Sequence, residues 1–167
     1  MFKSGFVALV GRPNVGKSSL LNALVKQKIA ICSNKPQTTR NAIRGIVTTE
    51  EQQIIFVDTP GMHKPKSLLG ERMNSTIHRT LAEVDAIVMM LDATDTFGGG
   101  DKFVIERVQQ VDTPTVCVIN KADKVLPPRL LEQITNAAVL GKWVDVLTTS
   151  ATRQTGLGDL ISTLATL

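Results

Sequence analysis

Short apolar runs alternate with segments of helical periodicity along the 167 residues of the chain. Runs of four to eight apolar residues bounded by turn residues are typical of buried strands, whereas apolar residues three or four apart are typical of amphipathic helices. The runs predict strands at 5–10, 42–48, 53–58, 86–91, 115–119 and 144–148. The helical spacing predicts helices at 18–25, 74–84, 101–111, 128–140 and 157–165.

The composition and order of these elements predict the sheet. Continuous Val and Ile runs indicate strands that are buried on both faces, as in parallel sheets covered by helices. Alternation of strands and helices is typical of α/β folds. The strands at 42–48 and 53–58 are joined by only four polar residues, TEEQ, so they should form a hairpin. We therefore predict one α/β domain over residues 1–167, with a six-stranded, mostly parallel sheet, one antiparallel edge strand and helices on both faces.

A glycine-rich motif lies between the first predicted strand and the first predicted helix. Residues 11–18 read GRPNVGKS and match G-x-x-x-x-G-K-[ST], a phosphate-binding loop. The N–H groups of such a loop and of the following helix N-terminus point at phosphate oxygens. We expect Lys17 to reach the β- and γ-phosphates and the Ser18 hydroxyl to bind Mg²⁺. The residues predicted to surround the phosphates are Gly11, Arg12, Pro13, Asn14, Val15, Gly16, Lys17, Ser18 and Ser19.

A second motif, DTPG, begins with Asp58 at the end of a predicted buried strand. Ligands of parallel α/β sheets bind beyond the carboxyl ends of the strands. We expect Asp58 to face Mg²⁺ through water and the Gly61 N–H to contact the γ-phosphate. An ordinary Asp-Thr-Pro-Gly turn would need the same residues for steric reasons, but the upstream phosphate loop favours the nucleotide interpretation.

Two further motifs predict that the base is guanine. Residues 120–123 read NKAD after a predicted strand, and a carboxylate at Asp123 can accept two N–H bonds that guanine offers and adenine lacks. Asn120 can bond the base and brace the phosphate loop, and Lys121 can lay its apolar stem over the ring. After the next strand, TTSA places Ser150 and Ala151 where a backbone N–H, that of Ala151, can donate to guanine O6.

The segment PQTTR supplies threonine hydroxyls that can close over Mg²⁺. Thr38 and Thr39 are both candidates, and we favour Thr39; a threonine-rich surface loop is the alternative interpretation. The residue after Gly61 is Met62, where many nucleotide hydrolases place a glutamine that orients water. No arginine is evident as a cis-acting finger. We therefore expect slow intrinsic turnover, on the order of 10⁻⁴ to 10⁻² s⁻¹.

Charge and composition further limit the kind of ligand and the class of protein that the sequence predicts. The first 49 residues carry eight Lys and Arg and no Asp or Glu, although the whole chain has a net charge of +4. A basic N-terminal third of the chain is typical of a protein that binds a polyanionic ligand. No aromatic residues lie between these charges, however, as a surface that stacks on nucleic-acid bases requires.

Cys32 and Cys117 form no CxxC pair, which gives no support for a disulfide framework or zinc site. No run is long enough to span a membrane and no signal-peptide pattern is present, so we expect a cytoplasmic protein.

Taken in order, GRPNVGKS, PQTTR, DTPG, NKAD and TSA resemble the motifs of the translation-factor-related GTPases. KPQTTR together with DTPGMHKPKSLLGERM is similar to the Era family of bacterial ribosome-assembly GTPases. The resemblance implies a P-loop, Ras-like GTPase domain that hydrolyses GTP to GDP and phosphate, with Lys17, Thr39, Asn14 and Gly61 in catalytic roles. The Der and tRNA-modification GTPases are alternatives, but they carry Gly-Val before the loop threonine, where this chain has Pro36 and Gln37. A non-hydrolysing guanine-nucleotide scaffold is the other alternative.

The same resemblance implies partners and an ion. It implies a KH domain beyond residue 167 that binds 16S rRNA and the 30S subunit, together with peripheral membrane association; the GTPase domain itself we expect to be monomeric. Several GTPases with a hydrophobic residue in place of the glutamine use K⁺ where others place an arginine, and in that group an asparagine of the phosphate loop helps to hold the ion. In this chain that residue is Asn14, acting with carbonyls near 30–37. The rival interpretation is that Asn14 only shapes the loop.

Overall fold

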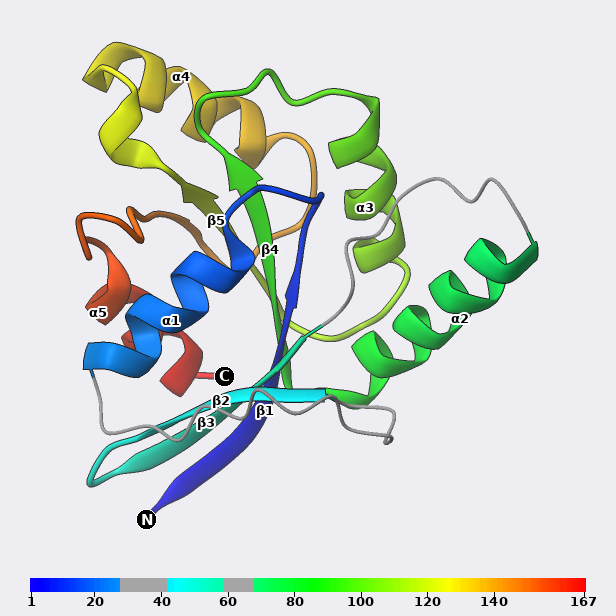
Figure 1. Ribbon diagram of the computed structural model, residues 1–167, viewed down its shortest axis with the longest axis vertical. Helices are drawn as coiled ribbons and strands as arrows, with labels where there is room; N and C mark the ends of the chain where they lie inside the picture. Colours follow the sequence, from blue (N-terminus) through cyan, green and yellow to red (C-terminus); the bar gives the residue numbers. More distant parts are fainter. Residues whose placement is uncertain (28–41, 59–67) are drawn as a thin grey trace.

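The computed structural model describes residues 1–27, 42–58 and 68–167, and within them a six-stranded sheet forms the centre of the molecule (Figure 1). The strand order is β2-β3-β1-β4-β5-β6, and only the edge strand β2 runs antiparallel to its neighbour, β3. This confirms the predicted mostly parallel sheet with one antiparallel edge. The strands are β1 (Lys3–Val10), β2 (Ala42–Thr48), β3 (Gln52–Asp58), β4 (Ala86–Asp92), β5 (Thr115–Asn120) and β6 (Val146–Thr148).

Helices cover both faces of the sheet, as predicted. The helix α2 begins at Leu68, six residues before the predicted start, and runs through Gly70; a glycine costs only about 1 kcal/mol in a helix, so this residue does not end it. In the described ranges no helix is both long and apolar enough to cross a membrane. The helices are α1 (Lys17–Gln27), α2 (Leu68–Glu83), α3 (Gly99–Gln109), α4 (Pro127–Ala138) and α5 (Leu157–Ala165), with a 3₁₀ turn η1 (Ala122–Lys124).

Several other element boundaries differ from the sequence pattern by one or two residues, as at the starts of β6 and α3. The last strand begins at Val146 instead of residue 144, since the Asp145 carboxylate accepts the Val146 N–H at 2.8 Å. The helix α3 begins at Gly99 instead of residue 101, because the Asp101 carboxylate accepts the Gly98 N–H at 3.3 Å and closes the first turn. Side chains that bond the local backbone shift the ends of elements in ways that periodicity does not record.

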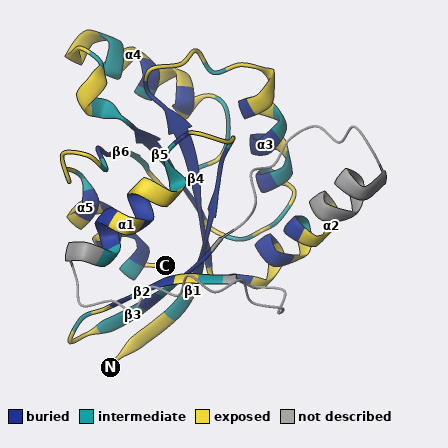
Figure 2. Ribbon diagram, in the orientation of Figure 1, coloured by how far each residue is buried: buried dark blue, intermediate teal, exposed yellow. Residues whose placement is uncertain are grey.

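Alternate residues of the strands divide the interior into two cores (Figure 2). Leu9, Val88 and Val118 pack with α1 and α5 on one face, whereas Met89 and Cys117 pack with α2, α3 and α4 on the other. Met89, Met90 and Cys117 are all fully buried. Burial raises the pKa of the Cys117 thiol to about 12, so this cysteine is an unreactive core residue.

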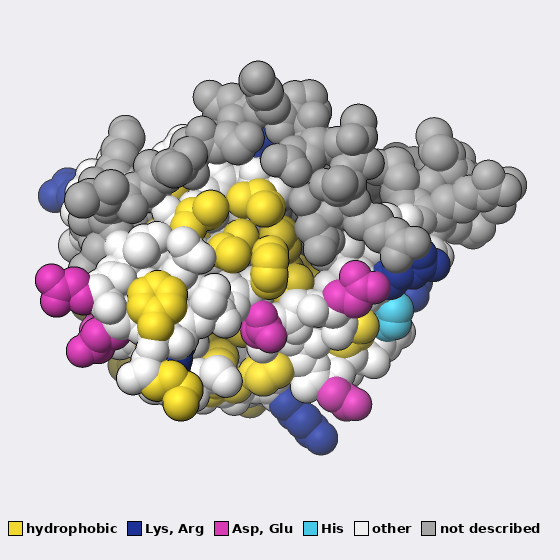
Figure 3. All heavy atoms as spheres, turned by 90° about the horizontal axis from the view of Figure 1, so that it is seen from below, with side chains coloured by type: hydrophobic (Ala, Val, Ile, Leu, Met, Phe, Trp, Pro, Cys, Tyr) yellow, Lys and Arg dark blue, Asp and Glu magenta, His cyan; other side chains and the backbone are white. Residues whose placement is uncertain are grey.

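The two ends of the sheet differ in character. At one end, β1, β3, β4 and β5 finish together in the loops that carry the sequence motifs, with Leu9 in register with Asp58 and Asp92 in register with Asn120. At the other end, hydrophobic side chains gather on the surface (Figure 3). A pocket there is lined in part by Met1, Phe2, Val7, Ile54, Leu164 and Leu167. The chemistry-bearing residues therefore lie at the carboxyl end of the sheet.

Candidate nucleotide-binding site

The loop between β1 and α1 turns through backbone conformations that its sequence permits. Asn14 and Gly16 have φ values of 68° and 100°, in the left-handed region that glycine and asparagine tolerate best. A Cβ on Gly16 would overlap the Asn120 amide nitrogen, and one on Gly11 would lie 2.9 Å from the Met90 carbonyl oxygen. The glycines thus let the loop pass close to β4 and β5.

Asn120 joins this loop to the other side of the site. Its side-chain Nδ2 donates to the Val15 carbonyl at 3.1 Å, while its Oδ1 accepts the Thr149 hydroxyl at 3.1 Å and the Ala151 N–H at 3.3 Å. The side chain is buried, so each polar atom needs such a partner. Asn120 thereby fixes the phosphate loop against the segment after β6, and the Ala151 N–H that we assign to guanine O6 lies beside it.

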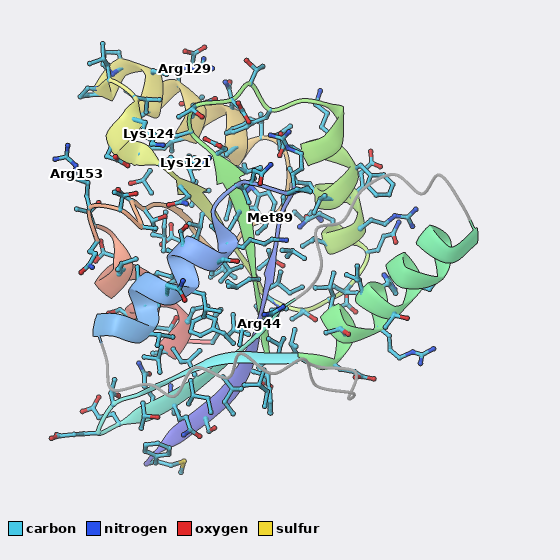
Figure 4. The ribbon with its side chains drawn as sticks, in the orientation of Figure 1. Arg44, Met89, Lys121, Lys124, Arg129 and Arg153 are labelled. Carbon is cyan, nitrogen blue, oxygen red and sulfur yellow. The ribbon has the colours of Figure 1, made fainter. Side chains whose placement is uncertain are left out.

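Lys121 makes a second connection to the phosphate loop (Figure 4). Its Nζ donates to the Asn14 carbonyl at 2.9 Å and to the Asp92 carboxylate at 2.6 Å. Burial by itself raises the pKa of Asp92, but hydrogen bonds from Lys121 and from the Thr94 hydroxyl and N–H outweigh it and hold that pKa below its usual range. Asp92 is therefore ionised and fixes the ammonium group at the end of the Lys121 stem.

Asp123 presents an exposed carboxylate on the turn η1. The Ser150 hydroxyl donates to its Oδ1 at 2.7 Å, and the Arg153 N–H donates to that same hydroxyl at 3.1 Å. The bond from Ser150, with the nearby positive charges of Arg153 and Lys124, holds the pKa of Asp123 below its usual range. Figure 4 shows Lys124 and Arg153 at the same end of the molecule as Lys121. The carboxylate is oriented and charged, as a receptor for two N–H donors requires.

The first turn of α1 completes the phosphate side. The Lys17 Nζ donates to the Gly11 carbonyl at 3.2 Å, Ser18 and Ser19 are exposed, and the first turn of the helix contains no acidic residue. The first N–H groups of a helix have no intrahelical acceptor, and its dipole favours an anion there. This geometry fits a phosphate group.

Arg12 points away from this cradle. Its Nε donates to Asp101 at 2.7 Å and one terminal nitrogen donates to Asp95 at 3.1 Å, and these bonds, that to Asp101 first, raise the pKa of the guanidinium. Its side chain is thus bonded to α3 and to the loop before it.

Some functional residues escaped the sequence analysis, and others lie outside the described structure. Asp92 ends a buried strand just as Asp58 does, so the same signal could have identified it. Thr149 and Asp101 carry no comparable motif. Among the sequence-predicted residues, Thr38, Thr39, Gly61 and Met62 lie outside the described residues, as does the side chain of Asp58.

Comparison with known proteins gives one family and several relatives. The 50S ribosome-binding GTPase family matches residues 6–121. The GTPase Era of Thermoanaerobacter sp. strain X514 is 55% identical over 149 residues, covering 89% of this chain and 49% of the relative. That of Thermoanaerobacter pseudethanolicus gives the same values. The chain therefore spans about half the length of the curated relatives it matches.

Solved structures agree with the fold. A crystal structure of Era in complex with MgGDPNP and nucleotides 1506–1542 of 16S ribosomal RNA has a TM-score of 0.78 at 35% identity, covering 99% of this chain and 57% of that one. A variant of Aquifex aeolicus Era bound to GDP·AlF₄⁻ gives the same score, identity and coverage. The G domain of the T. maritima FeoB iron transporter has a TM-score of 0.68 at 21% identity, with 98% of each chain covered, a likeness of fold alone.

Proposed function

Because this chain belongs to the family of 50S ribosome-binding GTPases, we propose that it binds GTP and hydrolyses it to GDP and phosphate, as the nucleotide switch of a longer protein. One observation carries the proposal. Through its Asn120 side chain the chain bonds its phosphate loop directly to the segment that orients Asp123, so the phosphate and guanine sites are parts of one network. A phosphate loop alone would be compatible with many nucleotides.

Each side chain then has a definite task. The loop N–H groups and Lys17 hold the β- and γ-phosphates and offset their charge. Asp123 accepts the two N–H donors of the guanine edge, and the stem of Lys121, fixed at its end by Asp92 and the Asn14 carbonyl, covers the ring. Hydrolysis of this type depends on positioning and on charge stabilisation rather than on a covalent intermediate.

The donor set also suits Mg²⁺. Mg²⁺ is bound by hydroxyl, carboxylate and phosphate oxygens in sites of this type. Ser18 at the start of α1, Asp58 at the end of β3 and Thr39 would hold it. When bound, Mg²⁺ neutralises charge that develops on the phosphates.

The enzyme proposal is tested by single-turnover kinetics of residues 1–167 with GTP. We expect phosphate release at roughly 10⁻⁴ to 10⁻² s⁻¹, and no inhibition by a large excess of ATP. Absence of phosphate release over hours, with GTP bound, would instead favour the non-hydrolysing scaffold. Competition by ATP would contradict the guanine assignment to Asp123.

We propose further that K⁺ assists hydrolysis at Asn14. In wild type, turnover in K⁺ should exceed turnover in Na⁺ by about tenfold, less than the roughly 10³–10⁵ that an arginine finger supplies. Asn14 has a positive φ of 68°, so Asn14→Gly keeps the loop conformation and removes only the amide. We expect Asn14→Gly to bind GDP normally and to hydrolyse GTP equally fast in both salts. Retained K⁺ stimulation in this variant would mean that Asn14 only shapes the loop.

The ribosomal role rests on the relatives. We propose that the full-length protein acts in small-subunit assembly and binds 16S rRNA and the 30S subunit through a KH domain beyond residue 167, since the Era structure contains 16S rRNA. Cosedimentation of the full-length protein with purified subunits tests this: GTP-dependent binding to 30S supports it. Binding to 50S alone, or to tRNA-modification partners, would favour a sister class. Cytoplasmic action, peripheral membrane association and a monomeric GTPase domain remain predictions.

A further inference from the structure

The second residue of the phosphate loop is tied to a helix 89 positions away in the sequence. We propose that Asp101 is a positioning residue for nucleotide binding: through Arg12, it sets the conformation of the phosphate loop. The inference rests on the proposed function, because it assigns a task to a residue that lies outside the nucleotide site itself.

The bond between Arg12 and Asp101 has the properties of a structural anchor. Asp101 is 1% exposed, and its two carboxylate oxygens accept the Arg12 Nε at 2.7 Å and the Gly98 N–H at 3.3 Å. A buried carboxylate that loses its cationic partner is strongly destabilised, so it holds the guanidinium in place. Asp95 contacts the same guanidinium, but its side chain is 52% exposed, and exposed ion pairs contribute little.

Gly100 provides an independent sign that this contact is built into the fold. A Cβ at this position would lie 2.8 Å from Arg12 Cδ, so any side chain here would force the arginine stem to move away from the first turn of α3. The adjacent Gly99 has nothing within 4 Å of its Cβ position. Of these two helical glycines, only Gly100 lies against Arg12.

The anchor acts on the atoms that hold phosphate. Arg12 follows Gly11, whose carbonyl accepts the Lys17 Nζ, and two residues further on the Asn14 carbonyl is held by Lys121. The loop is thus held by α3 on one side, through Arg12, and by Asn120 and Lys121 on the other. Release of Arg12 removes the bond to α3 and disturbs the backbone from Gly11 to Pro13.

Gly100→Ala tests the contact from the side of α3. The new methyl group displaces the Arg12 stem and disturbs the buried ion pair, whereas alanine in place of a helical glycine offsets part of that cost. We expect this variant to release fluorescent GDP about tenfold faster than wild type, with an unfolding midpoint without nucleotide below that of Gly99→Ala. Gly99→Ala is the matched control and should leave the release rate unchanged.

Asp101→Asn and Arg12→Ala complete a double-mutant cycle. Each should also speed GDP release about tenfold, and the double variant should be no faster than either single one, because both remove the same link. Asp95→Asn should change the rate by no more than about twofold. If Gly100→Ala and Asp101→Asn release GDP at the wild-type rate, or if the two rate increases multiply in the double variant, this inference is overturned and the proposed function is not. Failure of wild type to bind GDP would overturn the proposed function with it.

Discussion

Asp123→Asn is expected to bind GTP more than about a hundredfold more weakly than wild type and to bind xanthosine triphosphate more tightly. Ionised Asp123 offers two acceptor oxygens to the two N–H donors of guanine, and the Ser150 hydroxyl orients it at 2.7 Å. An asparagine offers one acceptor and one NH₂ group, which faces a guanine donor. Xanthine carries a carbonyl at that position, so the same NH₂ group finds an acceptor there.

Competition of GTP and of xanthosine triphosphate against fluorescent GDP measures the affinity of each variant for both nucleotides. Asp112→Asn removes an exposed acid elsewhere on the surface and serves as the matched control, with both affinities unchanged. If Asp123→Asn loses affinity for both nucleotides equally, the carboxylate supports the local fold and does not recognise the base.

Gly16→Ala should abolish detectable nucleotide binding and lower the free energy of unfolding by about 2 kcal/mol. The residue has a φ of 100°, which costs energy for any residue with a Cβ. That Cβ would also overlap the amide nitrogen of Asn120. Asn120 would have to move, and its bonds to Val15, Thr149 and Ala151 would be lost together.

Urea denaturation without nucleotide and titration with fluorescent GDP measure the two effects separately. Gly99→Ala, which meets nothing within 4 Å, should bind GDP as wild type does and should unfold at the same or higher urea concentration. A Gly16→Ala protein that binds GDP with wild-type affinity would show that the close approach of loop and Asn120 has no role in the site.

Much of the fold could be predicted because its signals are local. Continuous apolar runs indicated all six strands, and the short link TEEQ indicated the antiparallel pair. The predicted start of α2 was wrong, because a glycine weakens the helical pattern in the sequence, whereas its cost within a helix is only about 1 kcal/mol. The start of α3 was wrong for a different reason: Asp101 closes a turn of glycines that carry no helical pattern of their own.

The site divides in the same way. Motifs predicted which loops meet at the carboxyl end of the sheet, and the structure brings Asn14, Asn120, Lys121 and Ala151 together there. The bonds that support them were not predictable. Arg12 and Asp101 are ordinary charged residues in the sequence, and nothing local indicates that residues 89 positions apart form a partly buried ion pair. Long-range pairing is fixed by the fold, so it appears only once the fold is known.

The bonds of Asn120 and Lys121 to the carbonyls of Val15 and Asn14 also have an entropic consequence. A flexible loop must lose conformational freedom when it closes around a ligand, and that loss subtracts from affinity. Here the loop is ordered by bonds within the chain itself, so the entropy is lost during folding. A guanine nucleotide then binds to a loop that is already ordered. If any of these bonds is weakened, the loss of conformational entropy occurs on binding instead of on folding, and the affinity falls.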